Sequence, residues 1–149
     1  MKLFTDLTTL LRTQYAMPFW RSNLAAYQAA KAAVVFQRGD YAAAFSPLIT
    51  YYELILRSSS AHFRPDVAAA LELDWWIIHR ERDRHPAGDL EAALAKLQSE
   101  LYGRPAADFA EHGRYRAEAM QLRDAGGDWA RIEALLMDSW TSLHRQVWK

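Results

Sequence analysis

The sequence predicts an all-α fold: a single-domain bundle of about six to seven mostly antiparallel helices over residues 1–149. Three observations lead to this prediction. Apolar residues recur at spacings of three and four along most of the chain, which is the period of an amphipathic helix. Glycine, proline and aspartate stand at the breaks between these stretches, where they end one helix and cap the next. The connections are short and no stretch has the alternation of a strand, so consecutive helices are expected to pack side by side.

The composition is that of a compact globular chain. Of the 149 residues, 51% are hydrophobic and 13% aromatic, with six glycines and five prolines. Lys+Arg and Asp+Glu balance at 18 each, so there is no overall basic field to attract nucleic acid or an anionic membrane. The absence of cysteine excludes disulfides, thiol nucleophiles and cysteine-zinc sites. Charges in the N-terminal apolar stretch and the lack of a run of about twenty apolar residues predict a cytoplasmic protein without a signal peptide or membrane segment.

The first two helices are divided at Met17 and Pro18. A short helix with Leu7, Leu10 and Leu11 on one face should end before them, because the residue before a proline avoids the α conformation. The second helix is expected from Pro18 to Arg38 and has two apolar faces. The face of large side chains, which also carries Lys31, contains Trp20, Leu24, Tyr27 and Val34. The face of mostly small side chains, which would let a neighbouring backbone come close, contains Ala25, Ala29, Ala32, Ala33 and Phe36.

A third helix is expected from Tyr41 to Arg57, with Gly39 ending the second helix and Asp40 capping the third. Around this junction the chain reads AVVFQRGDYAAAF, from Ala33 to Phe45. This run resembles the helix-turn-helix centre of a tetratricopeptide or Sel1-like repeat, and the resemblance extends over residues 25–56. No second copy follows at the expected period, so the resemblance implies one helical hairpin of that geometry within a bundle. It also implies a surface that binds other proteins.

The fourth helix, expected from Asp66 to His85, is the one around which the chain is organised. It contains adjacent tryptophans at positions 75 and 76 and ends in a cluster of mixed charges. Asp74 lies three and four residues from alanine, leucine and isoleucine on both sides, which predicts a carboxylate on a buried apolar surface. A buried charge is unfavourable unless it is paired and hydrogen-bonded. We therefore expect Asp74 to pair with an arginine, Arg116 being the first choice, and we keep open the alternative that it serves as an acid, a base or a ligand anchor.

Three more helices complete the predicted bundle. The fifth follows Asp89 and ends at Gly103, and the sixth runs from about Ala106 to Asp124. Small residues on one line of the sixth helix are expected to receive the two tryptophans of the fourth. The seventh helix follows Asp128. Its predicted apolar stripe contains Trp129, Ile132, Leu136, Trp140, Leu143 and Val147.

The histidines and charged residues do not form a recognisable chemical site. His79 lies four residues before Asp83, and Glu81 four before His85, but a metal site needs at least three converging ligands and no HExxH or ExxH motif is present. The charges of residues 79–85 alternate at spacings typical of a solvated helix end. No serine lies in a GxSxG context and there is no glycine-rich phosphate loop. We expect no cofactor, no metal and no catalytic residue.

The preferred functional hypothesis is a protein-interaction or accessory module. Its expected interaction surface lies on the hairpin, where Tyr27, Tyr51 and Tyr52 would contact an apolar peptide of a protein partner. The alternative is a small-molecule-binding protein or enzyme, with an interior pocket that contains Asp74, His79 and Arg116. The sequence leaves the oligomeric state open, because surplus apolar surface on the second or seventh helix could cover either a neighbour in the chain or a second subunit.

Overall fold

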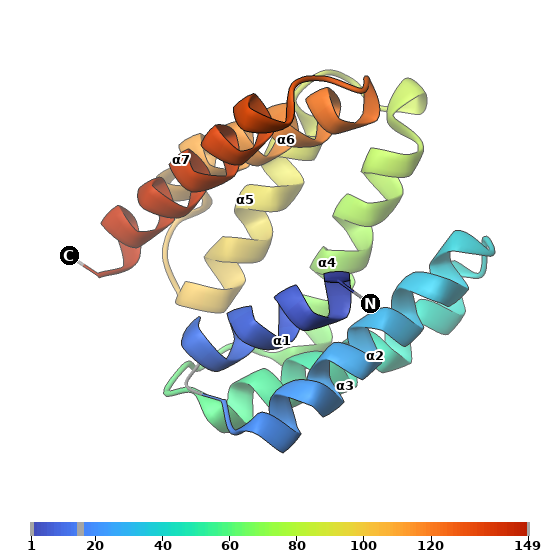
Figure 1. Cartoon of the computed structure of the whole chain (residues 1–149), viewed down its shortest axis with the longest axis vertical. Helices are drawn as coiled ribbons and strands as arrows, with labels where there is room; N and C mark the ends of the chain where they lie inside the picture. Colours follow the sequence, from blue (N-terminus) through green and yellow to red (C-terminus); the bar gives the residue numbers. More distant parts are fainter. Residues whose placement is uncertain (1, 15–16, 149) are drawn as a thin grey trace. The chain divides into compact units, whose positions relative to one another are not determined.

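The computed structural model of the chain describes residues 2–14 and 17–148. Within these residues the fold consists of seven α-helices and two short 3-10 turns and contains no strand, which confirms the all-α prediction. The elements are α1 (Lys2–Gln14), α2 (Phe19–Gln37), α3 (Tyr41–Ser58), α4 (Pro65–Arg80), η1 (Arg82–Arg84), α5 (Asp89–Tyr102), η2 (Ala106–Phe109), α6 (Ala110–Asp124) and α7 (Trp129–Val147) (Figure 1). No helix in the described residues is long and apolar enough to span a bilayer.

Backbone packing divides the chain into two compact units, the first ending at Leu73 and the second beginning at Asp74. The first contains α1, α2, α3 and the first part of α4, and the second contains the rest of α4 and everything after it. The boundary therefore falls inside α4, the helix that the sequence marks as central.

In the first unit, α2 and α3 form a helical hairpin, with α1 packed against α2 (Figure 1). The small face of α2 points inward, since Ala25 and Ala32 are fully buried. Alanine has no long side chain to hold the helices apart, so their backbones come close. In the turn between the helices Gly39 has φ +89°, which glycine adopts without strain. The Asp40 side chain then accepts a hydrogen bond of 3.1 Å from the Ala43 backbone N–H and caps α3, as predicted.

Aromatic contacts strengthen this hairpin and join it to α4. The rings of Phe36 and Tyr41 stack across the turn, with centroids 4.7 Å apart. Deeper in the unit, Tyr52 packs edge-on against Phe63 and donates a hydrogen bond of 3.0 Å from its hydroxyl to Glu72 Oε2 on α4. The hairpin is therefore held at both ends by specific contacts within its own unit.

In the second unit, α6 lies between α5 and α7. Trp75 packs against Leu94, Ala117 and Met120, so the predicted contact between a tryptophan of α4 and a small residue of α6 is confirmed. Gly113 has a different neighbour. A Cβ atom at this position would lie 2.5 Å from the backbone oxygen of Glu91, so the missing side chain is what allows α6 to approach α5.

Two helix boundaries differ from the prediction. The helix expected to continue to His85 ends at Arg80 and is followed by the 3-10 turn η1. His85 precedes Pro86 and is extended, with φ −116° and ψ 140°, because the proline ring disfavours the α conformation in the preceding residue. The sixth helix begins with the 3-10 turn η2, so regular α structure starts at Ala110.

The predicted apolar stripe of α7 is rotated relative to the buried face. The buried residues of α7 are Ile132, Leu135, Ser139, Ser142 and Leu143. Trp129 and Leu136, which the stripe included, are 58% and 41% exposed. Ile132 and Leu143 of the predicted stripe are buried, and Trp140 and Val147 pack against the core. The prediction is therefore wrong for Trp129 and Leu136, and the buried face includes two serines that a search for large apolar residues misses.

Candidate functional site

The most extensive line of exposed apolar side chains in the described part of the first unit lies on α2. Trp20, Tyr27, Val34 and Leu24 are 62%, 56%, 47% and 41% exposed, respectively. Their spacings of four, three and seven residues place them on one side of the helix, opposite the buried alanines Ala25 and Ala32. Lys31 is exposed on the same side. We call these five residues the α2 outer face.

The charge of the α2 outer face is positive. The helix contains Arg21 and Lys31 but no aspartate or glutamate. Arg21 donates a hydrogen bond of 3.0 Å to Ser58 Oγ on α3, and its guanidinium lies 4.9 Å from the centre of the Trp20 ring. Lys31 is thus the charge that projects from among the apolar side chains. A ligand for this face needs apolar groups for most of its length and a negative group near Lys31.

Of the three tyrosines expected to form the interaction surface, only Tyr27 is exposed in the structure. Tyr52 is 4% exposed and belongs to the core of the first unit, so the prediction that it contacts a partner is wrong. Tyr51 is partly buried and packs edge-on against Tyr52, with ring centroids 5.0 Å apart. Tyr51 and Tyr52 are adjacent on α3, with Tyr52 on its buried face, whereas Tyr27 lies on the exposed side of α2. The surface that the structure supports therefore extends from Tyr27 along α2.

The prediction of a buried Asp74 is also wrong, because this residue is exposed. It follows Asp66 and Ala70 at intervals of four, and all three are exposed, so they form one solvent-facing line of α4. Ala70 adds little apolar surface to this line, because a single methyl group gains little from burial and alanine is stable on an exposed helix face. Arg116, the expected partner, has its guanidinium 5.3 Å from the centre of the Trp75 ring.

We expect Asp74→Ala to change the free energy of unfolding by less than about 0.5 kcal/mol, because an exposed carboxylate away from a cap or network contributes little. Ala68→Asp is the matched contrast, since Ala68 is fully buried on the same helix. It should lower stability by more than about 2 kcal/mol, because it buries a carboxylate. Urea denaturation of the three proteins measures both effects. A large loss for Asp74→Ala would show that the carboxylate has a structural partner.

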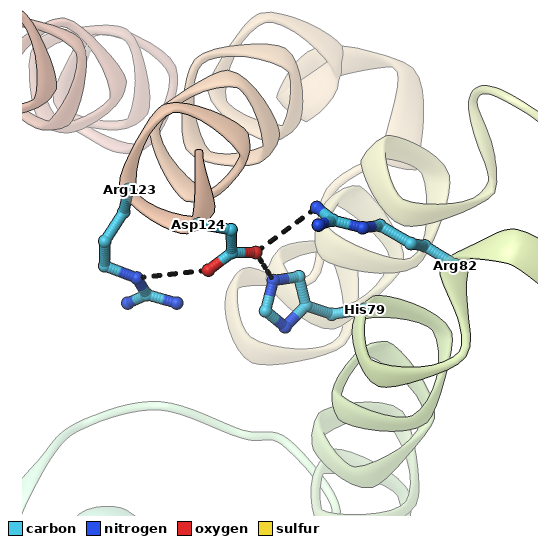
Figure 2. A network of polar contacts seen from close by, with 4 residues as sticks. All are labelled: His79, Arg82, Arg123 and Asp124. Carbon is cyan, nitrogen blue, oxygen red and sulfur yellow. Dashed lines mark hydrogen bonds and ion pairs between the residues drawn. The ribbon is translucent and has the colours of Figure 1, made fainter. Parts of the chain in front are cut away.

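His79 takes part in a polar network at the end of α4, in the second unit (Figure 2). Its Nε2 donates a hydrogen bond of 2.7 Å to Asp124 Oδ2 at the end of α6. Arg82 Nη1 lies 3.2 Å from the same oxygen, and Arg123 Nε lies 3.7 Å from Oδ1. In Figure 2, His79 and Arg82 approach the carboxylate from one side and Arg123 from the other.

The electrostatics of this network explain the state of Asp124. Partial burial of the carboxyl opposes its ionisation, but the hydrogen bond from His79 and the charges of His79, Arg123 and Arg82 outweigh it, so the pKa of Asp124 is lowered. An ionised Asp124 requires a proton on His79 Nε2. The network ties the end of α4 to the end of α6. The sequence could not reveal it, because the two ends are 45 residues apart in the chain.

A buried histidine that the sequence did not single out lies between α6 and α7. His112 is 4% exposed, and its Nδ1 donates a hydrogen bond of 3.1 Å to the Ser139 carbonyl oxygen. Its Nε2 is buried without a hydrogen-bond partner among the described residues. Burial lowers the pKa of His112 from 6.5 to about 4, the Ser139 carbonyl raises it in part, and the charge of Arg116 lowers it further. In the sequence, His112 follows Phe109 by three residues and directly precedes Gly113. This position is the signal that could have identified it as a buried histidine.

The described part of the chain has no group of three or more histidine, aspartate or glutamate side chains arranged to hold a metal ion. His79 and His112 are each used in contacts within the second unit, as described above. The network around Asp124 and the contact at His112 therefore stabilise this unit, whereas the α2 outer face is directed at solvent.

Comparisons with protein-family models, with curated protein sequences and with solved structures give no match for the chain.

Proposed function

We propose that the protein is an interaction module that binds an amphipathic helical segment of a protein partner on the α2 outer face. The observation that carries the proposal is the line of four large apolar side chains, 41–62% exposed, on a helix whose opposite side is firmly packed. Isolated apolar residues on a surface are common, but an aligned set is typical of a binding site. The resemblance of residues 25–56 to a tetratricopeptide or Sel1-like hairpin supports the same class of function.

The chemistry of the α2 outer face defines the partner. An amphipathic helix presents apolar residues at spacings of three and four, which match Trp20, Leu24, Tyr27 and Val34. Lys31 interrupts this line, so a partner helix with a carboxylate at the facing position forms an ion pair there, and one with a lysine is repelled. The expected partner segment is therefore apolar along one side and acidic at its edge.

Two synthetic peptides test this proposal. Each is an amphipathic helix of about 18 residues with a leucine stripe, and they differ only in having glutamates or lysines along its edge. We expect the glutamate peptide to bind at least about tenfold more tightly, because only it pairs with Lys31. Fluorescence anisotropy of the labelled peptides measures both dissociation constants.

Variants of the chain locate the binding site. Trp20→Ala should weaken binding of the glutamate peptide by about tenfold or more, because exposed aromatic residues are frequent hot spots. Trp148→Ala removes another exposed tryptophan, on a different helix end, and should leave the affinity unchanged. Lys31→Glu should abolish the preference for the glutamate peptide, whereas Lys96→Glu on α5 should preserve it. Equal binding of the two peptides, or full affinity in Trp20→Ala, would rule out the α2 outer face as the site.

A further inference from the structure

A second line of exposed apolar side chains lies on α7. Met137, Trp129 and Leu136 are 63%, 58% and 41% exposed, and Trp140, four residues after Leu136, is partly buried. Glu133 lies among them and accepts a hydrogen bond of 2.8 Å from Trp129 Nε1. These five residues form the α7 outer face. They match the partner defined above, an apolar helix face that carries a carboxylate.

The two arginines of α7 are used elsewhere in the second unit. Arg131 pairs with Glu118 at 3.5 Å and Arg145 pairs with Glu111 at 3.8 Å, and both of these carboxylates belong to α6. The pairs draw both cations toward the flank of α7 that borders α6. The charge left among the exposed apolar side chains is therefore the carboxylate of Glu133, which is opposite in sign to that of Lys31 on α2.

We propose that the α2 outer face of one copy of the chain binds the α7 outer face of a second copy, with Lys31 opposite Glu133. This inference rests on the proposed function and names the partner as the chain itself. The charges are complementary, and both faces present large apolar side chains at helical spacing on either side of the charged residue. The proposed dimer is symmetric, and each copy supplies one α2 and one α7, so that the same contact forms twice.

The register fixes the direction of the contact. With Lys31 opposite Glu133 and the helices antiparallel, Tyr27 lies opposite Met137, Leu24 opposite Trp140, and Val34 opposite Ala130, next to Trp129. With the helices parallel, Tyr27 would lie opposite Trp129, and Trp20 and Leu24 would extend beyond the first residue of α7. Only the antiparallel arrangement places Leu24 and Val34 against apolar side chains on both sides of the ion pair. Antiparallel helices also have opposed dipoles, which attract each other.

A charge-reversal experiment on the full chain tests this inference. Sedimentation velocity should show a dimer for the wild-type chain at about 100 μM, and Lys31→Glu and Glu133→Lys should each be largely monomeric. Each variant places like charges in both contacts of the dimer, and about tenfold weakening per contact gives roughly 100-fold in the dissociation constant. Lys96→Glu and Glu53→Lys, exposed residues on α5 and α3, are the matched controls and should remain dimeric.

Mixing the two variants gives the decisive result. In a mixed dimer, the glutamate introduced at position 31 of one copy faces the lysine introduced at position 133 of the other, and the second contact keeps its native Lys31 and Glu133. The mixture should therefore form dimers although neither variant does so alone. A wild-type chain that is monomeric at about 100 μM overturns the inference, and so does a mixture that stays monomeric when the wild type is dimeric. Circular dichroism confirms that each variant is folded.

The same variants separate this inference from the proposed function. Glu133→Lys leaves the α2 outer face intact, so the monomeric variant should bind the glutamate peptide at least as tightly as the wild-type chain. Peptide binding by a wild-type chain that does not dimerise overturns only the inference. If Glu133→Lys fails to bind the glutamate peptide but the mixture of variants forms dimers, the general helix-binding function is overturned and self-association remains.

Discussion

Acidification from pH 7 to pH 4 is expected to lower the free energy of unfolding by up to about 3 kcal/mol through His112. The folded state holds this histidine in its neutral form, because protonation would bury a charge that has one carbonyl acceptor and no partner at Nε2. Its pKa is lowered from 6.5 to about 4, and each pKa unit corresponds to roughly 1.4 kcal/mol.

The sign of the effect follows from which state binds the proton. Below pH 6.5 the unfolded chain takes up a proton at His112 and the folded chain does not, so unfolding is favoured. The stabilising contribution is complete above pH 6.5 and is lost as the pH falls toward 4. Acid also protonates Asp124. Because the pKa of Asp124 is lowered in the folded chain, the stability that its ionised carboxylate contributes is lost only at pH values below the usual pKa of an aspartate.

Urea denaturation between pH 4 and pH 7.5 measures this dependence, and His112→Gln isolates it. The absolute stability of the variant differs from that of the wild type. Its free energy of unfolding should nevertheless change less with pH, because the contribution of His112 is absent. His144→Gln, at an exposed histidine on α7, is the matched substitution with which His112→Gln is compared. Identical slopes for the wild type and His112→Gln would contradict the burial of a neutral histidine between α6 and α7.

Gly113→Ala is expected to lower the free energy of unfolding by about 1–3 kcal/mol, the usual effect of forcing extra volume into a packed site. The added Cβ would lie 2.5 Å from the Glu91 backbone oxygen, and a backbone group cannot rotate away as a side chain can. The sign of the stability change distinguishes a crowded site from an open one, because replacing a glycine by alanine within an unobstructed helix raises stability by roughly 0.5–1 kcal/mol.

The reverse change at an exposed site provides the matched control. Ala92 lies on α5 near the contact but faces solvent, so Ala92→Gly should show only the loss of helix propensity, roughly 0.5–1 kcal/mol. Thermal and urea denaturation of both variants give the comparison. A Gly113→Ala protein more stable than the wild type would mean that α5 and α6 are farther apart than described.

The helices themselves were predictable from the sequence, because their limits are set by local chemistry. Pro18 and the Gly39–Asp40 pair act within one or two turns of their own positions, and the helices begin and end close to them. Of the candidate site, the predicted residue that the structure retains is Tyr27. The prediction for Asp74 is wrong because helical periodicity groups residues on a face but does not say which face is covered.

The sequence by itself therefore determined an all-α chain, the approximate positions of its helices and the small face of α2. The tertiary structure decided which apolar faces are buried. On α2 the alanines are buried while Trp20 and Tyr27 are exposed, and on α7 Ser139 and Ser142 are buried beside Ile132, Leu135 and Leu143 while Trp129 and Leu136 are exposed. Local sequence does not decide this, because which face is covered depends on where the neighbouring helices pack. Some of the large apolar residues that predict a core thus form the exposed surfaces on which the proposed function rests.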